Sequence, residues 1–427
     1  MQIKKPTELL ENRQFVYLWL EQILTQFSYN LINFSLIVTV FKLTHSNLSV
    51  GVLLLCFFLP SSIFTNFAGL ASDYFHRKRI MTLANIVWST LVLTLTILTK
   101  SFLAICLVSI LIQITDEFFT NANMATLPSV VPKKNLMIAN SLFSLTNYLC
   151  LILGSLSVGL LMRLISPTAP YIIASLLVYL GAFLVSKIHF EQKLIKPPKK
   201  KVIFTKIVGD LQKGWQFIRA NRAITVLVTF LVSLSALQAL VLAIAPGFLE
   251  NVLRIEATDA SFVFILPLGI GLLAAGSFLG RFGKKYRKIS LIQRGMVLVS
   301  LALTFLALIP RSTRIANLTR KTTNFESRLG LSLPLSLVIT LLGFGGALVF
   351  VPANTSFQEK TPEQLRGRTI STFHFLGYLF SSILTLSSGF FADKIGFTPI
   401  LAFLAFWGIF LGFFSRKILI GAGILEK

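Results

Sequence analysis

The feature that most constrains this chain is a series of twelve long apolar runs separated by short polar segments. Each run holds about 20 residues or more, which at about 1.5 Å per residue is enough to cross a bilayer as a helix. The mean hydropathy of +0.78 and the charged content of 13% exclude a soluble domain. Barrel strands would be about ten residues long and would alternate in polarity. The sequence therefore predicts an all-α integral membrane protein with twelve transmembrane helices.

The apolar runs fall into two groups of six on either side of a basic segment. We expect the first six spans at 15–41, 48–70, 80–99, 102–125, 138–163 and 169–189. We expect the second six at 222–249, 257–281, 289–309, 333–355, 367–391 and 397–419. Pro197 and Pro198 break any helix in the lysine-rich segment between them. The predicted domains are an N-terminal six-helix bundle at 1–189, a cytoplasmic basic linker at 190–221 and a C-terminal six-helix bundle at 222–427.

Most of the net charge of +24 lies in loops that follow even-numbered spans. Because basic loops stay in the cytoplasm, we expect both termini inside and a location in the plasma or inner membrane. This assignment accounts for the positive charge without nucleic acid as a partner. The segment 311–330 is also basic, although its position in the chain predicts an outward-facing loop. We interpret it as a basic insertion that either binds an anionic surface or is simply solvated.

The turn at 69–79 reads GLASDYFHRKR and joins the second span to the third. It resembles the loop signature of the major facilitator superfamily, with matches at Gly69, Asp73, Arg77 and Lys78. Tyr74 and His76 depart from that signature, which has a basic residue and a glycine there. The resemblance implies a gating motif. In it, the glycine permits close helix approach and the Asp73 carboxylate lies near the positive N-terminal end of a helix from the other half.

Two later segments repeat this turn, as expected for a transporter built from internal repeats. The first, at 276–285, has Gly280 in place of the acid, and the second carries Gly389, Asp393, Lys394 and Gly396. The loops at 132–140 and 362–368 also resemble each other. Together with the opening Asn12-Arg13-Gln14-Phe15, these segments are similar to the superfamily branch that contains macrolide-efflux and siderophore-export proteins. The resemblance implies two six-helix bundles that alternate access to a central site.

Ionisable groups inside a membrane are costly, so each one suggests a function. Asp116 and Glu117 are adjacent in the fourth span, about thirteen residues from its start. Two hypotheses remain open for them: proton coupling or cation recognition in transport, or a structural ion pair with a loop base such as Arg77. Glu21 lies only a turn or two from the cytoplasmic end of the first span. We interpret it as a side chain that reaches water along the helix.

Polar side chains within the spans are candidates for lining a substrate cavity. Related exporters often have an aspartate near Tyr29 and Asn30, and this chain lacks it. His374 is interpreted as a packing residue. The cavity candidates are Gln26, Tyr29, Asn30, Gln113, Asn121 and Gln238. We identify no metal-ligand cluster, cofactor-binding loop or catalytic residues, and we do not expect an enzyme.

These observations favour a secondary active transporter, an antiporter that exports hydrophobic or amphipathic small molecules in exchange for protons. Its expected partners are a small-molecule substrate, protons and membrane lipids, and we expect it to act as a monomer without a cofactor. Two alternatives stay open. One is a lipid or lysolipid flippase on the same fold, which would need no proton, and the other is a membrane scaffold or receptor that transports nothing.

Overall fold

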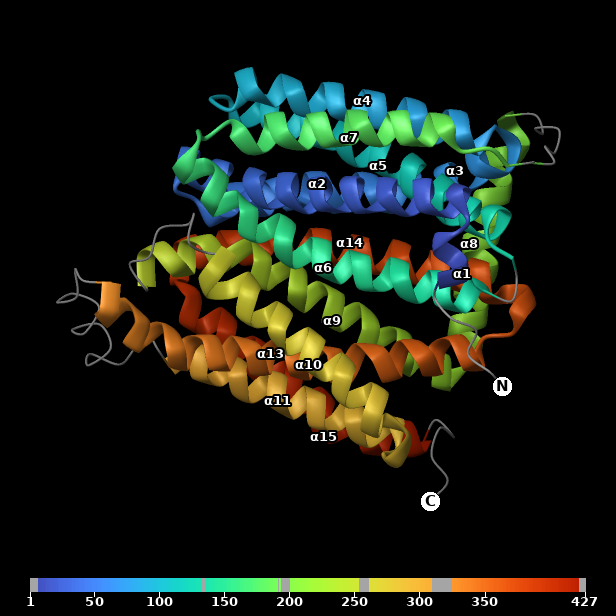
Figure 1. Cartoon of the computed structure of the whole chain (residues 1–427). Helices are drawn as coiled ribbons and strands as arrows, with labels where there is room; N and C mark the ends of the chain where they lie inside the picture. The colour runs from blue at the N-terminus through green and yellow to red at the C-terminus, as the bar shows by residue number, and fades with distance from the viewer. Residues whose placement is uncertain are drawn as a thin grey trace. The chain divides into compact units, whose positions relative to one another are not determined.

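The computed structural model describes residues 7–132, 135–190, 192, 200–252, 261–308 and 325–421. Within these ranges the regular secondary structure is helical, and none of the described residues forms a strand. Eleven of the described helices are long and apolar enough to cross a membrane, and Phe397–Phe410 is a shorter apolar helix. The predicted all-α membrane fold is confirmed, and its helices are labelled in Figure 1.

The helices of the first half begin and end close to the predicted spans. They are α1 (Thr7–Leu10), α2 (Arg13–Thr44), α3 (Asn47–Tyr74), α4 (Arg77–Leu98), α5 (Phe102–Val130), α6 (Leu136–Leu164) and α7 (Ala169–Lys187). Several of them extend a few residues past the apolar run, because backbone hydrogen bonding continues beyond the part of a helix that lipid covers. α5 is an example: it continues through Pro128 and ends at the cap residue Val131.

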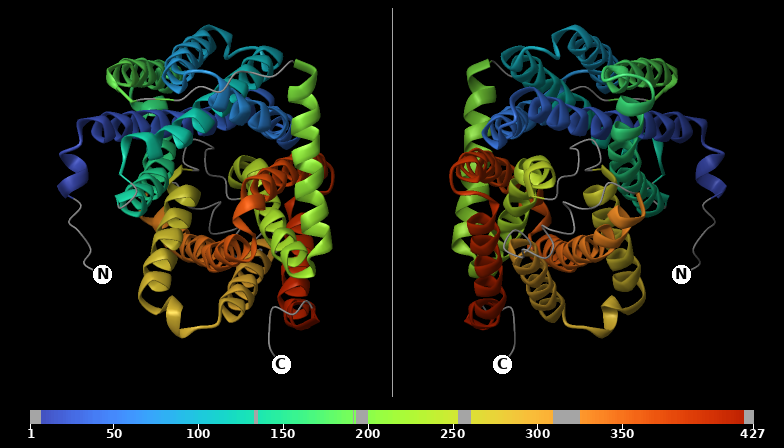
Figure 2. Two further views of the ribbon diagram at one scale, coloured as in Figure 1. Left: turned by 90° about the vertical axis from the view of Figure 1, so that its right-hand side faces the viewer. Right: turned by 90° about the vertical axis from the view of Figure 1, so that its left-hand side faces the viewer.

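The described residues of the second half form α-helices joined in places by short π- and 3₁₀ turns. Its elements are α8 (Lys200–Ala220), α9 (Arg222–Gly247), the π-turns η2 (Phe248–Val252) and η4 (Ser261–Ile265), α10 (Leu266–Phe282), the 3₁₀ turn η5 (Gly283–Lys285), α11 (Lys288–Leu308), α13 (Phe325–Lys360), α14 (Glu363–Ile395) and α15 (Phe397–Gly421). Figure 2 follows the chain from α10 through η5 to α11, in yellow to orange. Most of the basic segment 311–330 lies outside the described residues, so its interpretation stays a prediction.

Helix α8 is a feature that the sequence did not predict, because hydropathy alone marks its residues as a polar linker. It runs from Lys200 to Ala220. Asp210 on α8 forms an ion pair with Arg368 on α14, at 2.7 Å between Oδ1 and Nε. The linker region is therefore largely helical and is packed against α14 from within the same compact unit.

Contacts divide the chain into two compact units. The first contains residues 1–43 and 59–207, and the second contains 44–58 and 208–427. Helix α3 is shared between them, because its residues up to Phe58 belong to the second unit and those from Leu59 belong to the first. Pro60 lies inside the helix directly after this division. The predicted domain boundaries at 189 and 222 stay a prediction.

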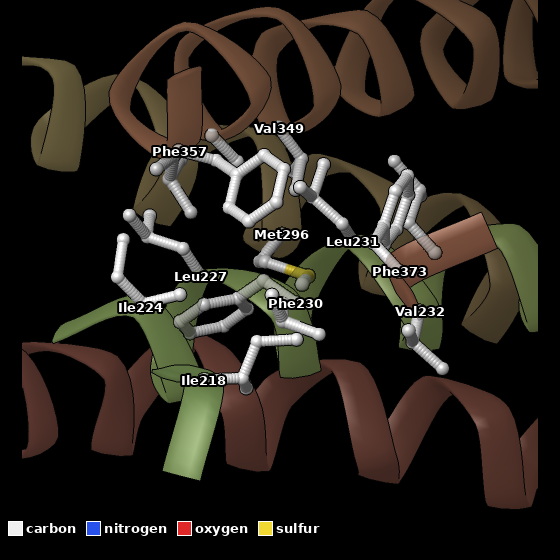
Figure 3. Packing of buried hydrophobic residues seen from close by; sticks show 14 residues of the cluster. Ile218, Ile224, Leu227, Phe230, Leu231, Val232, Met296, Val349, Phe357 and Phe373 are labelled. Carbon is white, nitrogen blue, oxygen red and sulfur yellow. The ribbon is translucent and has the colours of Figure 1, made fainter. Parts of the chain in front are cut away.

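Each unit has its own apolar core. The first includes Phe15 and Leu18 of α2, Met81 of α4 and Phe119 of α5. The second includes Leu227 and Phe230 of α9, Met296 of α11, Val349 and Phe357 of α13 and Phe373 of α14, whose side chains interlock in Figure 3. Lipid tails are as apolar as these side chains, so close packing, rather than exclusion of water, holds such helices together. The cores position the polar side chains described next.

Candidate functional site

The predicted gating residues lie where α3 ends and α4 begins. Arg77 is the first residue of α4, and its guanidinium donates hydrogen bonds to the Ser72 carbonyl at 3.1 Å and the Ala125 carbonyl on α5 at 2.6 Å. Its Nη1 also donates to Ser129 Oγ at 3.3 Å. The side-chain amide of Gln192 donates to the same Ser72 carbonyl at 3.2 Å. Arg77 therefore fastens the turn to the C-terminal end of α5.

The other members of the motif make fewer contacts. Asp73 is exposed, and it forms no hydrogen bond or ion pair with the described residues. Lys78 is half-buried at the start of α4. A Cβ added at Gly69 would meet Asn121 Oδ1 at 3.6 Å, which is an ordinary contact. Within the first unit no close helix approach depends on this glycine, and the predicted gating role stays a prediction.

The two acids predicted as coupling groups lie on α5 among neutral partners. Glu117 is 8% exposed, and its carboxylate accepts hydrogen bonds from the hydroxyls of Ser61 and Thr65 on α3. Asp116 is half-buried and accepts a hydrogen bond from Thr120 one turn further along α5. The described residues form no ion pair with either acid. Both hypotheses for this pair of acids, proton coupling and structural pairing, stay predictions.

The prediction that Glu21 reaches water is wrong, because its side chain is fully buried, at 0% exposure. Its Oε1 accepts hydrogen bonds from Thr25 Oγ1 at 2.6 Å and from Asn85 Nδ2 on α4 at 3.1 Å. Asn123 Nδ2 on α5 lies 3.3 Å from Oε2. Helical spacing alone shows that Glu21 and Thr25 share a face of α2, but it does not show that this face points into the bundle. Three neighbouring helix positions supply the partners that keep the carboxylate inside.

The remaining cavity candidates of the first unit fall into two groups. Tyr29 donates to Gln113 Oε1 at 3.3 Å, and Gln113 in turn donates to Asn33 Oδ1 at 3.1 Å, so these side chains connect α2 to α5. Asn30 donates instead to the Gln26 carbonyl on its own helix, at 2.7 Å. Asn121 makes the same kind of bond to the Glu117 carbonyl, at 2.9 Å. The fold therefore brings Tyr29 and Gln113 together, whereas the side chains of Asn30 and Asn121 are each hydrogen-bonded to a backbone carbonyl of their own helix.

In the second unit, Gln238 lines a cavity of about 320 Å³. The cavity lies among α3, α9 and α14, and its walls combine aromatic rings with a few polar groups. The Phe58 and Tyr378 rings are stacked with centroids 6.2 Å apart, and the His374 ring lies 6.1 Å from Tyr378. The other polar lining residues are Ser235 and Ser381. A volume and lining of this kind suit a small amphipathic molecule.

A second cavity in the same unit is larger, at about 630 Å³, and is almost entirely apolar. It lies among α8, α9, α11, α14 and α15, and several lining side chains are exposed: Trp215, Phe380, Ile383, Phe403 and Trp407. The hydroxyls of Thr225 and Thr229 donate to backbone carbonyls of Ile218 and Thr225, at 2.6 and 2.9 Å. Arg219 is the charged residue of the lining. We refer to this cavity as the apolar groove.

Asp393, in the last of the repeated turns, accepts four hydrogen bonds. Its Oδ1 accepts from the backbone N–H and the side-chain Nδ2 of Asn47, at 3.0 and 2.7 Å. Its Oδ2 accepts from Ser46 Oγ at 2.7 Å and from the Leu48 N–H at 3.0 Å. Asn47 begins α3, so the carboxylate of Asp393 caps the N-terminus of that helix.

A family model described as Major Facilitator Superfamily matches residues 18–385, which is most of the chain. The chain belongs to the Major Facilitator Superfamily. The resemblance inferred from the turn at 69–79 is thereby confirmed at the level of the superfamily. No curated protein matches the chain.

Solved structures of transporters share this fold at low sequence identity. The nucleoside transporter NupG superposes with a TM-score of 0.71 at 13% identity, over 95% of this chain and 99% of its own. A peptide transporter, POT, in complex with sulfate has a TM-score of 0.73 at 15% identity, with 97% and 96% covered. A bacterial homolog to the human lysosomal transporter Spinster has a TM-score of 0.62 at 15% identity, with 96% and 95% covered. The superfamily member described here is thus a multi-pass membrane protein with a transporter fold.

Proposed function

We propose that this transporter exports hydrophobic or amphipathic small molecules in exchange for protons. The observation that carries the proposal is the pair of adjacent carboxyl groups at Asp116 and Glu117 on a membrane-spanning helix. Their partners are the hydroxyls of Ser61, Thr65 and Thr120, which are neutral. Carboxyl groups without a cationic partner inside a membrane are typical of proton pathways.

In this proposal each acid has a distinct environment. Glu117 faces α3 and is buried, so a proton bound there is shielded from bulk water in the state described. Asp116 points to a different neighbour, the hydroxyl of Thr120 on its own helix. Two adjacent carboxylates repel each other, so a proton shared between them lowers the electrostatic cost of burying the pair. Release of that proton as the transporter changes state would drive the cargo in the opposite direction.

The cavity lined by Gln238 supports the proposed class of cargo. Aromatic side chains provide most of the binding surface, and Gln238, His374 and two serines provide a small number of polar contacts. Such a surface favours molecules with an apolar body and one or two hydrogen-bonding groups. Nucleosides and peptides are the cargo named for two of the similar structures, and they are not part of this proposal.

The test is cargo-evoked proton movement in proteoliposomes that contain an internal pH dye. Amphipathic compounds are screened with the wild-type protein and with a variant that carries Asp116→Asn and Glu117→Gln. We expect proton movement with at least one compound in the wild type and its loss in the double variant. Glu359→Gln is the matched control. It removes an exposed carboxylate near the end of α13 that forms an ion pair with Lys288. Proton movement that persists in the double variant would contradict the proposed coupling site.

A lipid or lysolipid flippase is the second candidate, and the apolar groove favours it. The groove is about twice the volume of the other cavity, and the hydroxyls of Thr225 and Thr229 in its lining donate to backbone carbonyls. Arg219 supplies a positive charge suited to an anionic headgroup. Uptake of a labelled lysolipid that continues in the presence of a protonophore supports the flippase. Uptake that stops with the protonophore supports proton-driven export.

We also propose that the protein lies in the plasma or inner membrane with both termini in the cytoplasm. The basic loops after even-numbered spans support this orientation. The test uses single cysteines introduced at Lys100 and at Arg287 in intact cells. The loop at Lys100 is predicted to face outward, and the loop at Arg287 is predicted to face the cytoplasm. An impermeant maleimide should label the cysteine at position 100 and leave the one at position 287 unlabelled. The reverse pattern would overturn the orientation.

A further inference from the structure

Glu21 is a buried carboxyl group to which neither candidate function assigns a role. The groups that contact it come from four helices. Thr25 lies on its own helix, Asn85 on α4 and Asn123 on α5, and the backbone of Gly181 on α7 faces the same point, since a Cβ there would lie 3.7 Å from Glu21 Cγ. All of these groups are neutral. A carboxylate in such surroundings has only hydrogen bonds to stabilise its charge.

The hydrogen bonds around Glu21 leave one acceptor unused. Asn123 donates through Nδ2 to Glu21 Oε2 at 3.3 Å and to Gln22 Oε1 at 2.8 Å. The oxygen of the same amide, Asn123 Oδ1, is buried and has no hydrogen-bond partner among the described residues. Leaving a buried polar atom unpaired costs about 1–3 kcal/mol, so such atoms usually mark a water, an ion or a second state.

A chain of amides leads from this point to the surface of α6. Gln22 donates through Nε2 to Asn147 Oδ1 at 2.8 Å. Gln22 is buried, whereas Asn147 is exposed. The sequence of contacts is therefore Glu21, Asn123, Gln22 and Asn147, and each of the last three carries one donor group and one acceptor group that can exchange places by a half-turn of the amide.

We propose that Glu21 is a second proton-binding site and that Asn123 transmits its protonation to α6 through Gln22 and Asn147. Its role in transport rests on the proposed proton coupling, but the binding of a proton at this site does not. A proton from the aqueous phase forms an O–H bond at Glu21 Oε2 and neutralises the carboxylate. That oxygen changes from an acceptor into a donor, and on deprotonation the proton returns to water.

The change at Glu21 has a direct geometric consequence. A protonated Oε2 is a weaker acceptor for Asn123 Nδ2, and it can donate to Asn123 Oδ1 once that amide makes a half-turn. Asn123 Oδ1 then also accepts from Gln22 Nε2, so Gln22 turns and presents its oxygen to Asn147. The amide of Asn147 turns to donate. One proton at a buried carboxyl group thereby reverses the polarity of a hydrogen bond on the exposed face of α6.

The test is infrared difference spectroscopy of the full-length protein in proteoliposomes, recorded between acidic and alkaline buffer with protons as the only ligand. We expect a protonated-carboxyl band in the wild type that is lost in Glu21→Gln and is shifted in Glu21→Asp, which keeps the carboxyl group. The Asp116→Asn, Glu117→Gln variant should retain the Glu21 band. In Asn123→Leu, the pH-dependent change in the side-chain amide bands should be lost.

Identical spectra for the wild type, Glu21→Gln and Glu21→Asp would overturn the inference and leave Glu21 as a structural hydrogen-bonding group. Loss of the carboxyl band on addition of sodium at constant pH would also overturn it, because the site would then hold a metal cation. The outcome is independent of the transport assay. Absence of cargo-evoked proton movement refutes the proposed function and leaves the infrared result standing, whereas unchanged spectra with intact proton movement refute only the second site.

Discussion

Two segments of this chain share the same spacing of glycine and aspartate but make very different contacts. Gly69 and Asp73 end α3, and Gly389 and Asp393 lie near the end of α14. Asp393 accepts four hydrogen bonds from Ser46, Asn47 and Leu48. Asp73 is exposed and accepts none from the described residues. The motif by itself therefore does not determine the contact.

The difference lies in what comes close to each glycine. A Cβ at Gly389 would collide with the Asn47 carbonyl, so α3 and α14 touch there at backbone distance. One turn later on the same helix face, Asp393 reaches the free N–H groups at the start of α3. A carboxylate near the C-terminus of α14 gains nothing from its own helix dipole, so its favourable interaction is with α3. At Gly69, the space left by the missing side chain is not filled in this way.

The largest effect is expected from Gly389→Val, which removes the close approach itself. The valine side chain would force α3 away from α14 and should lower the free energy of unfolding by about 2 kcal/mol, as overpacking commonly does. Gly276→Val on α10 is the matched control, because no atom lies within 4 Å of a Cβ added there. Thermal unfolding in detergent gives the measurement. Equal destabilisation by both variants would show that the contact is unimportant.

A smaller effect is expected from Asp393→Ala, which keeps the approach but removes the cap. Loss of an N-terminal cap typically costs about 1 kcal/mol, and the exposure of Asp393 argues against a larger value. Hydrogen exchange at the Asn47 and Leu48 amides should accelerate, since both N–H groups lose their acceptor. Unaltered exchange at these two amides would contradict the capping role.

The smallest effect on stability is expected from Asp73→Asn. Asp73 forms no hydrogen bond or ion pair with the described residues, so the free energy of unfolding should change by less than about 0.5 kcal/mol. The predicted gating role, in contrast, requires the charge, and the variant should transport more slowly at unchanged stability. Transport assays and unfolding measured on the same preparation separate the two. Transport by Asp73→Asn at the wild-type rate would contradict the gating role of Asp73.

The sequence predicted the helices well because the solvent constrains them strongly. A helix in lipid must be apolar over a fixed length, so each span is visible as a run of residues, and the observed bounds of α3 and α7 differ from the predicted ones by only a few residues. Helix α8 escaped prediction since its polar composition carries no such signal. Its contact with α14 depends on the pair Asp210 and Arg368, far apart in the chain.

The candidate site was predictable as a set of residues but not as a set of contacts. Asp116 and Glu117 were identifiable because charge is rare within a span, and the structure adds that their partners are hydroxyls. Glu21 was misread because distance from a helix end does not reveal which way a side chain points. The repeat containing Asp393 was recognised, but its partner Asn47 lies 346 residues away, beyond any local pattern.

The division of α3 between two units has a mechanical meaning. Pro60 lies directly after the residue where the helix passes from one unit to the other. Proline cannot donate to the hydrogen-bond ladder of a helix, so it lowers the local stiffness of the helix. The amides that Asp393 caps precede Pro60 and Ser61 follows it, so the proline separates the contacts that α3 makes in one unit from those that it makes in the other.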